Sequence, residues 1–457
     1  MHGATATCRW PEAFGRILTL AAVAGLVVAS VVDDAAAQDV GASGPVPRSA
    51  DILPLRPFEP RGAGLGYRVG RFIVQPVVAT GLAYDDNINA DNDDRVDDFI
   101  WVGAVGARAQ ALLRRHAFGF DAVAGTSRYF QNSSESDVSW RVGADGRLDL
   151  TRRSQLAARV DYTRAEESRE SVDRDSDADD SVFHQINSRV TYDQRFTRTT
   201  FALALDANRT DFEDSGEADR DRWRFRVAPS VSYDIRPRLR GDLSPSYART
   251  AYDTEDDAGR DQDEEDYEVQ AGLSYTVSPR LSTRGFVGYS WFRPADDEED
   301  DEEGVIFGGS LTYAVGERTT ASLAARRTIR DDTSLTFTGN LSHAFDNRTS
   351  VGLSASRSFQ DTNVSGATSR TTTSVSGNVR RAIRSDMALT ASTGASRTDY
   401  EGINRTDDSI FARLGYDWAF AQNVTFNAFY RYSQRFADQA DNDFYRNIVF
   451  IGVTVRL

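Results

Sequence analysis

Arginine and aspartate recur at every second position along many stretches of this 457-residue chain. In the stretch 138–150, charged or small residues alternate strictly with apolar ones. Side chains at alternate positions of a β-strand lie on one face, so such a face collects charges of both signs. It suits two roles, a wall stiffened by Arg–Asp ion pairs or a filter that sorts solutes by charge. The sequence leaves both roles open.

The residues that we assign to this charged wall are Arg141, Arg147, Arg159, Arg189, Arg224, Arg226, Arg413, Arg431, Asp145, Asp149, Asp161, Asp242 and Asp417. The same alternation adds Arg240, Arg284, Asp121, Asp193 and Asp206. Aromatic residues on this face are few, namely Phe183, Phe286, Phe411 and Phe429. A sugar-specific channel usually presents a continuous aromatic track, so their scarcity weakens that interpretation.

Two acidic runs form a second chemical feature. Asp253–Asp266 holds nine carboxylates against one arginine, and Asp296–Glu303 is eight carboxylates in a row. Such runs behave as solvated, self-repelling loops, or they bind divalent cations and bridge to lipopolysaccharide phosphates. Neither run has the spacing of an EF-hand, so we predict no defined metal site.

Catalytic constellations are not apparent in the sequence. After the first 37 residues the histidines are His116, His184 and His343, and none has a nucleophile and a carboxylate at a suggestive position. A hydrolytic triad needs all three groups together. We therefore expect no enzymatic activity and no cofactor.

The residues of the charged wall lie in strand-like segments, and Ser409–Tyr432 shows their pattern. Even positions from 410 to 420 are apolar or aromatic, while odd positions include Arg413 and Asp417. After the turn Ala421–Asn423 the alternation resumes. A strict period of two with aromatic residues near the strand ends is typical of strands that cross a membrane in a β-barrel.

Two kinds of connection alternate along the chain. The short ones are Arg114–His116, Thr151–Ser154, Thr197–Thr199, Arg236–Arg238, Ser278–Arg280, Gly316–Arg318, Asp346–Arg348, Arg384–Asp386 and Ala421–Asn423. The longer, acidic ones are Asp85–Asp97, Gln131–Asp137, Ser168–Asp180, Glu213–Arg220, Asp253–Asp266, Pro294–Glu303, Asp361–Arg370, Glu401–Asp407 and Ala437–Asp443, with the brief Asp331–Asp332 as an exception.

This alternation predicts an all-β fold, a transmembrane antiparallel β-barrel of about 20 strands (18–20), with short periplasmic turns and long acidic extracellular loops. A water-soluble β-sandwich also alternates apolar and polar residues, but its turn lengths do not alternate in step over so many strands. The prediction places the protein in the outer membrane of a Gram-negative bacterium.

The N-terminal region reads as a targeting segment. Arg9 and Arg16 precede the apolar run Ile17–Val32, and Ala35–Ala37 provides a cleavage site. We interpret residues 1–37 as a signal peptide, 38–66 as a flexible periplasmic leader and 67–457 as the barrel. The run is short for a membrane-spanning helix, which makes an anchor the weaker alternative.

Composition narrows the class of partner. All 53 basic residues are arginine and the net charge is −16, which argues against a nucleic-acid partner because nucleic acid requires a basic surface. The last strand is apolar at alternate positions up to Leu457, where outer-membrane barrels usually carry an aromatic residue that the barrel-insertion machinery recognises. We expect that machinery, outer-membrane lipid and lipopolysaccharide as partners.

Tyr67–Asn89, YRVGRFIVQPVVATGLAYDDNIN, resembles the opening of the outer-membrane β-barrel porins called the BBP2-like family. The likeness extends in style to Gly452–Leu457 at the C-terminus. The resemblance implies a wide barrel without catalytic residues, and some relatives are linked to export of extracellular polysaccharide.

These observations predict a porin-like channel for passive passage of small hydrophilic solutes, with an acidic outer mouth that prefers cations. A terminal conduit for exopolysaccharide export and a closed structural surface barrel stay open as alternatives.

Overall fold

The computed structural model describes residues 66–457, apart from residues 94, 173–180, 256–258, 297–300, 330–332, 363, 365, 368 and 439–442. The predicted signal peptide and the predicted leader up to residue 65 lie outside the described residues. So does the brief connection Asp331–Asp332.

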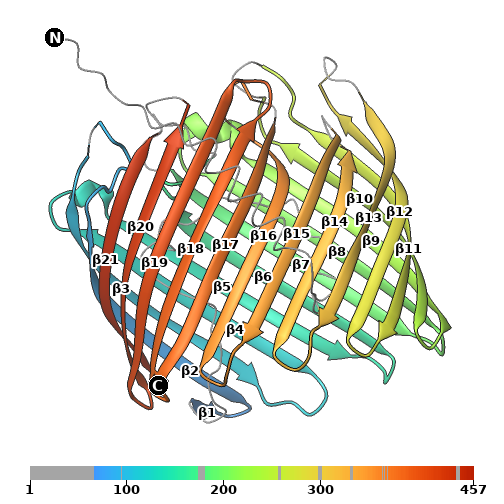
Figure 1. The fold of residues 1–457 in the computed structure, drawn as a ribbon, viewed down its shortest axis with the longest axis horizontal. Coiled ribbons are helices and arrows are strands. Elements are labelled where there is room, and N and C mark those ends of the chain that lie inside the picture. The colour runs from blue at the N-terminus through green and yellow to red at the C-terminus, as the bar shows by residue number, and fades with distance from the viewer. Residues whose placement is uncertain are drawn as a thin grey trace.

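Twenty antiparallel strands, β2 to β21, form one closed barrel (Figure 1). The first ten are β2 (Phe72–Asp85), β3 (Asp98–Ala111), β4 (Ala117–Tyr129), β5 (Asp137–Asp149), β6 (Ser154–Glu166), β7 (Val182–Arg195), β8 (Thr199–Phe212), β9 (Arg222–Arg236), β10 (Leu239–Tyr252) and β11 (Glu264–Ser278). The others are β12 (Leu281–Pro294), β13 (Glu302–Ala314), β14 (Thr319–Ile329), β15 (Thr333–Ala344), β16 (Thr349–Asp361), β17 (Ser369–Arg384), β18 (Met387–Tyr400), β19 (Arg405–Ala421), β20 (Val424–Ala437) and β21 (Phe444–Arg456). The predicted fold class and strand number are confirmed.

The barrel closes between its first and last long strands. β2 pairs with β21 from Val77↔Arg456 to Asp85↔Ile448, so neither strand leaves an open edge there. Closure satisfies backbone groups that hydrocarbon cannot hydrogen-bond. A short strand, β1 (Tyr67–Val69), pairs with β2 as an added hairpin.

The two ends of the barrel differ. At the end that holds the C-terminus, which we call the turn end, the connections are as short as two residues, for example 279–280 and 422–423 (Figure 1). At the opposite, loop end they run to stretches such as 86–97 and 167–181. Two 3₁₀ helices, η2 (Ser133–Glu135) and η3 (Ser215–Arg220), lie in loop-end connections. Within the described ranges, no helix is long and apolar enough to cross a membrane.

Alternation assigns each strand residue to the outer or the inner face. Val105, Val287, Leu414 and Ile451 have exposed fractions between 51% and 61%, which marks the outer, membrane-facing side. Exposed aromatic residues flank this apolar band near both ends of the strands, as Trp101, Trp223 and Tyr267 toward the loop end and Tyr233, Tyr275 and Phe420 toward the turn end. Such belts lie at the two membrane interfaces.

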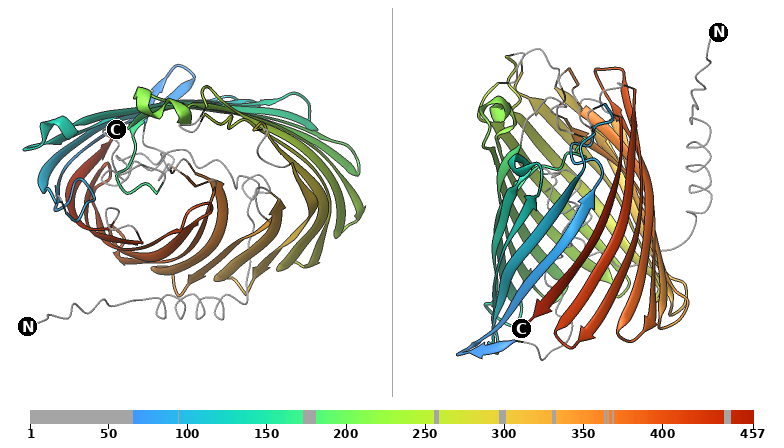
Figure 2. Two further views of the ribbon diagram at one scale, coloured as in Figure 1. Left: turned by 90° about the horizontal axis from the view of Figure 1, so that it is seen from above. Right: turned by 90° about the vertical axis from the view of Figure 1, so that its left-hand side faces the viewer.

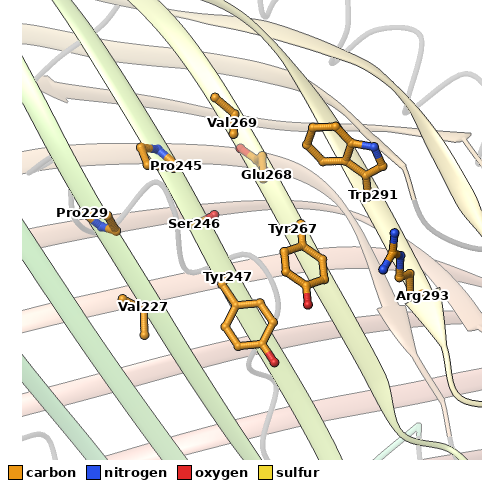
Figure 3. Close-up of a pocket in the computed structure, with 10 residues that line it drawn as sticks. All are labelled: Val227, Pro229, Pro245, Ser246, Tyr247, Tyr267, Glu268, Val269, Trp291 and Arg293. Carbon is orange, nitrogen blue, oxygen red and sulfur yellow. The ribbon is translucent and has the colours of Figure 1, made fainter.

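The outer wall has a gap in its hydrogen-bond ladder between β9 and β10. Paired positions stop at Leu243↔Val231 and resume at Tyr247↔Val227, with Pro229 opposite Pro245 in between. Proline has no N–H to donate, so neither residue can complete the pair. The outer-face groove over β9 to β12, of about 610 Å³, begins at these prolines (Figure 3).

Aromatic rings continue this groove toward the loop end. Tyr247 and Tyr267 lie side by side with ring centroids 4.9 Å apart, and Trp291 and Arg293 follow on β12 (Figure 3). This face therefore presents an apolar surface with amphipathic side chains toward the rim, which suits the boundary between lipid tails and head groups.

An apolar cluster lies inside the barrel next to the closing strands. Ile88 of the β2–β3 connection packs there with eight strand residues, Ala83, Ile100, Val102, Ala104, Tyr129, Phe429, Ile448 and Phe450. Phe429 and Phe450 stack with ring centroids 5.0 Å apart. The inner face is thus less uniformly polar than the alternation predicts, because part of the β2–β3 connection covers these side chains.

Candidate functional site

Every residue assigned to the charged wall lies on the inner face, opposite the exposed apolar side chains. The strand registers show this directly, because inner positions pair with inner positions: Asp145 pairs with Arg159, Arg226 with Asp206, and Arg413 with Arg431. The wall faces the lumen on strands from β5 to β20.

Ion pairs between residues of β3, β5 and β6 line one sector of the lumen. Asp161 accepts from Arg159 at 3.2 Å and lies 3.4 Å from Arg141. Arg147 lies 3.4 Å from Asp149, and Asp145 is reached by Arg108 at 3.4 Å. These groups are partly exposed to the lumen, so each pair contributes little stability by itself. They do line one sector of the lumen with paired charges.

Other wall residues pair with inner-face residues that the alternation also predicted, and one pairs with an amide that it did not single out. Asp242 lies 2.7 Å from Arg284, and Arg189 lies 2.7 Å from Asp206. Asp417 accepts from Asn427 at 2.7 Å.

Arg108 and Arg380 also lie on the inner face, although we did not assign them to the charged wall from the sequence. Arg108 contacts Asp145, and Arg380 lies 3.7 Å from Asp417. Their positions in the alternation would have identified them.

Two predicted wall residues have neighbours other than carboxylates. Arg413 stacks on Phe429, 3.9 Å from the ring centroid. Arg224 lies opposite Asn208 on β8.

A loop-end segment enters the lumen. We call residues Glu167–Val172 the lumen segment; they follow β6 and lie inside the barrel outline in the view from above (Figure 2). The carboxylate of Glu170 accepts from Arg431 at 2.6 Å, from Ser433 at 3.0 Å and from Arg446 at 3.0 Å. The backbone carbonyl of Glu170 accepts from Arg435 at 2.6 Å.

Further contacts hold the two ends of the lumen segment. At one end, Glu167 is fully buried and accepts from Arg220 at 2.9 Å. At the other, the Tyr400 hydroxyl donates to the carbonyl of Val172 at 2.8 Å. The segment therefore links the wall at β6–β9 with the wall at β18–β21 and narrows the loop end of the lumen.

Beneath the lumen segment, Asp85 and Arg446 form an ion pair whose side chains are both 0% exposed. The Nε of Arg446 donates to both carboxylate oxygens of Asp85, at 2.9 and 3.1 Å. Asp85 also accepts from the backbone N–H of Asn87 at 3.0 Å. Arg446 thus contacts the closing strand β2 and the lumen segment at once.

On the outside of the loop end, Asp253, the first residue of the acidic run 253–266, lies close to two carboxylates that the sequence did not single out. Oxygens of Asp211, Asp221 and Asp253 lie within 4.8 Å of one another. Arg209 hydrogen-bonds Asp211 and Asp253, and that bond to Arg209 holds the pKa of Asp253 below its usual value. Burial raises the pKa of Asp221. A guanidinium therefore already supplies positive charge to this group.

Comparisons with known proteins agree with this architecture. The family model described as "Putative beta-barrel porin 2" matches residues 56–348 and 333–457. Among solved structures, the ferric enterobactin receptor of Pseudomonas aeruginosa is similar at a TM-score of 0.50 and 8% identity, over 84% of this chain and 80% of that one. The outer membrane protein opdK of the same organism gives a TM-score of 0.40 at 10% identity, over 84% and 98%. Among curated proteins, none matches the sequence.

The match over nearly the whole barrel shows that this chain belongs to the beta-barrel porin 2 family. It is an outer-membrane β-barrel of a Gram-negative bacterium, and the resemblance noted at Tyr67–Asn89 is confirmed. At this low identity, the likeness to the enterobactin receptor shows the fold alone.

Proposed function

We propose that this protein is a porin-like channel through which small hydrophilic solutes cross the outer membrane by diffusion. The observation that carries the proposal is the closed barrel of 20 strands with charged side chains along its inner face. Barrels with more than about 16 strands enclose a water-filled lumen unless something fills it. The proposal includes no catalytic step.

The proposed orientation places the turn end in the periplasm and the loop end outside the cell, as is usual for such barrels. Lipid and lipopolysaccharide would then surround the aromatic belts. Among the described loop-end residues, Glu255, Asp261 and Asp301 are exposed carboxylates. They support an outer mouth with negative potential that favours cations at low ionic strength.

Single-channel recording tests this function. The full-length protein, purified from outer membranes in detergent, would be inserted into a planar bilayer under a salt gradient. We expect steady openings and a reversal potential that indicates cation preference at about 0.01 M salt and fades toward 1 M, because the Debye length falls from about 30 Å to 3 Å. A protein that inserts but never conducts would overturn the open-pore proposal.

A matched variant isolates the acidic mouth. Neutralising Glu255, Asp261 and Asp301 to Gln, Asn and Asn should reduce the cation preference while the conductance at 1 M salt stays unchanged. Unchanged selectivity at low salt would place the selectivity elsewhere in the lumen.

The lumen segment favours a second candidate function, a terminal conduit for polysaccharide export that is closed at rest. A conduit of this kind would be silent when purified and would conduct once the lumen segment is deleted. If the protein stayed silent after that deletion, a closed structural barrel would be the better account.

A further inference from the structure

The Glu170 carboxylate occupies an anion site that the barrel wall builds. One carboxylate oxygen accepts from Arg431, and the other accepts from both Ser433 and Arg446. Both oxygens of a planar carboxylate are therefore engaged by charged or hydroxyl donors, which is the arrangement that arginine favours for this group.

The donors belong to rigid strands, whereas the carboxylate they hold belongs to a connection. Arg431 and Ser433 lie two residues apart on the inner face of β20, and Ser433 pairs directly with Arg446 on β21. Ser433 and Arg446 are 5% and 1% exposed. A site supported by strands in this way keeps its geometry whichever carboxylate enters it.

The local charge balance also fits a carboxylate. Arg431, Arg435 and Arg446 surround the site, and Asp85 beneath it balances one of these three charges. Glu170 supplies a second negative charge, which contacts Arg431 and Arg446 directly. An anion is the natural occupant of such a partly desolvated position.

We propose that Arg431, Ser433 and Arg446 form a binding site for carboxylate-bearing solutes, and that Glu170 is a tethered competitor for it. An acidic sugar or organic acid entering the lumen displaces Glu170 and takes over its hydrogen bonds. The route by which the solute arrives rests on the proposed channel function, but binding itself does not.

Because Glu170 is covalently tethered next to the site, it lowers the affinity that we expect the site to show for a free solute. An intramolecular carboxylate has an effective concentration of about 1 mM or more, so it competes strongly with a free solute. The wild-type protein should therefore bind such solutes weakly. Removing the Glu170 charge should tighten binding by about tenfold or more.

Isothermal titration of the full-length protein in detergent tests this, with galacturonate as the probe and galactose as its uncharged match. Glu170→Gln should bind galacturonate at least about tenfold more tightly than wild type. Adding Arg431→Gln to that variant should abolish the gain. Glu401→Gln is the matched control, because Glu401 is an exposed loop-end carboxylate with the same charge, and it should leave binding unchanged.

Three results would overturn the proposal: no gain of galacturonate affinity in Glu170→Gln, an equal gain for galactose, or a gain that survives Arg431→Gln. Circular dichroism would establish that each variant is folded. If Glu170→Gln did not fold, Glu170→Asp would replace it. Its shorter side chain draws the carboxylate away from Arg431, so it should show a smaller gain in affinity, and no gain would again count against the site.

Bilayer recording of the same variants separates this proposal from the channel function. A silent protein whose Glu170→Gln variant gains affinity for galacturonate would refute the channel and support the site. A conducting protein without that gain would do the reverse.

Discussion

Asp85 and Arg446 lie 361 positions apart in the sequence and share a fully buried ion pair across the seam where the barrel closes. Asp85 ends β2, and Arg446 lies near the start of β21. The two strands also share backbone hydrogen bonds that begin at Asp85↔Ile448. The pair therefore joins the first and last long strands at the loop end. Arg446 of this pair also donates a hydrogen bond to Glu170.

Replacing Arg446 with Gln should strongly destabilise the barrel. The substitution leaves the Asp85 carboxylate buried without its cation, and breaking a buried pair in this way costs about 3 to 5 kcal/mol. Urea unfolding of the protein in lipid vesicles would measure the loss. Arg240→Gln is the control: its pair with Asp234 is about half exposed and screened by water, so its removal should cost much less stability than removal of the seam pair. Equal losses in the two variants would contradict a special role for the seam pair.

Asp346 should make stability depend on pH. In the turn before β16 it accepts from the backbone N–H groups of Arg348 and Thr349, at 2.7 and 2.6 Å, and these bonds lower its pKa. Its folded pKa is therefore below the unfolded value of about 3.9. The carboxylate then stabilises the fold above about pH 4, and this contribution is lost as the pH falls through the folded pKa.

The Asp346→Asn variant tests the pH dependence. Wild type should exceed the variant in urea midpoint at pH 7, and the difference should shrink as the pH falls below about 4 and through the folded pKa. A difference that stayed the same across this range would show that the carboxylate charge is irrelevant to the turn.

The two faces of the barrel should respond oppositely to a new charge. Val287 is 57% exposed on the outer face near the middle of β12, so Val287→Arg should cost about 2 to 4 kcal/mol by placing a cation in hydrocarbon. Thr338 lies near the middle of β15 on the inner face, so Thr338→Arg should cost much less. Unfolding titrations in vesicles would compare the two variants. A larger cost at Thr338 would contradict the face assignment.

Replacing the two opposed prolines should restore the missing backbone hydrogen bonds between β9 and β10. Replacing both Pro229 and Pro245 with Val restores two N–H groups at directly opposed positions, which should stabilise the barrel by about 1 to 2 kcal/mol. Hydrogen exchange would show whether the two new amides are protected. Unprotected amides in the double variant would mean that the gap has another cause.

The barrel could be predicted from the sequence because it depends on a local pattern, the alternation of apolar and polar residues along each strand. Alternate residues must face opposite sides of a strand, so the pattern at 138–150 or 409–432 decides which side chains meet lipid. The same rule places Arg147, Asp149 and Asp417 on the inner face, where the structure has them. The number of strands follows from counting the connections.

The lumen segment could not be predicted in this way. Glu170 belongs to a connection without periodicity, and its partners follow it by 261 to 276 positions. Nothing near Glu170 in the sequence indicates that it turns inward. The inner apolar cluster was not predicted for a related reason. Phe450 and Ile448 are apolar residues on the inner face, and Ile88, which packs against them, belongs to the distant connection between β2 and β3. The alternation of apolar and polar residues therefore predicts the barrel wall, whereas the lumen segment and the inner cluster depend on contacts between residues far apart in the sequence.

The position of the Glu170 partners imposes an order on assembly. Arg431, Ser433, Arg435 and Arg446 all belong to β20 and β21, which are the last strands of the chain. The donors that hold Glu170 come together only when these two strands have paired with each other. The lumen segment, which precedes them in the chain by more than 250 positions, can therefore dock only after β20 and β21 have formed their hairpin.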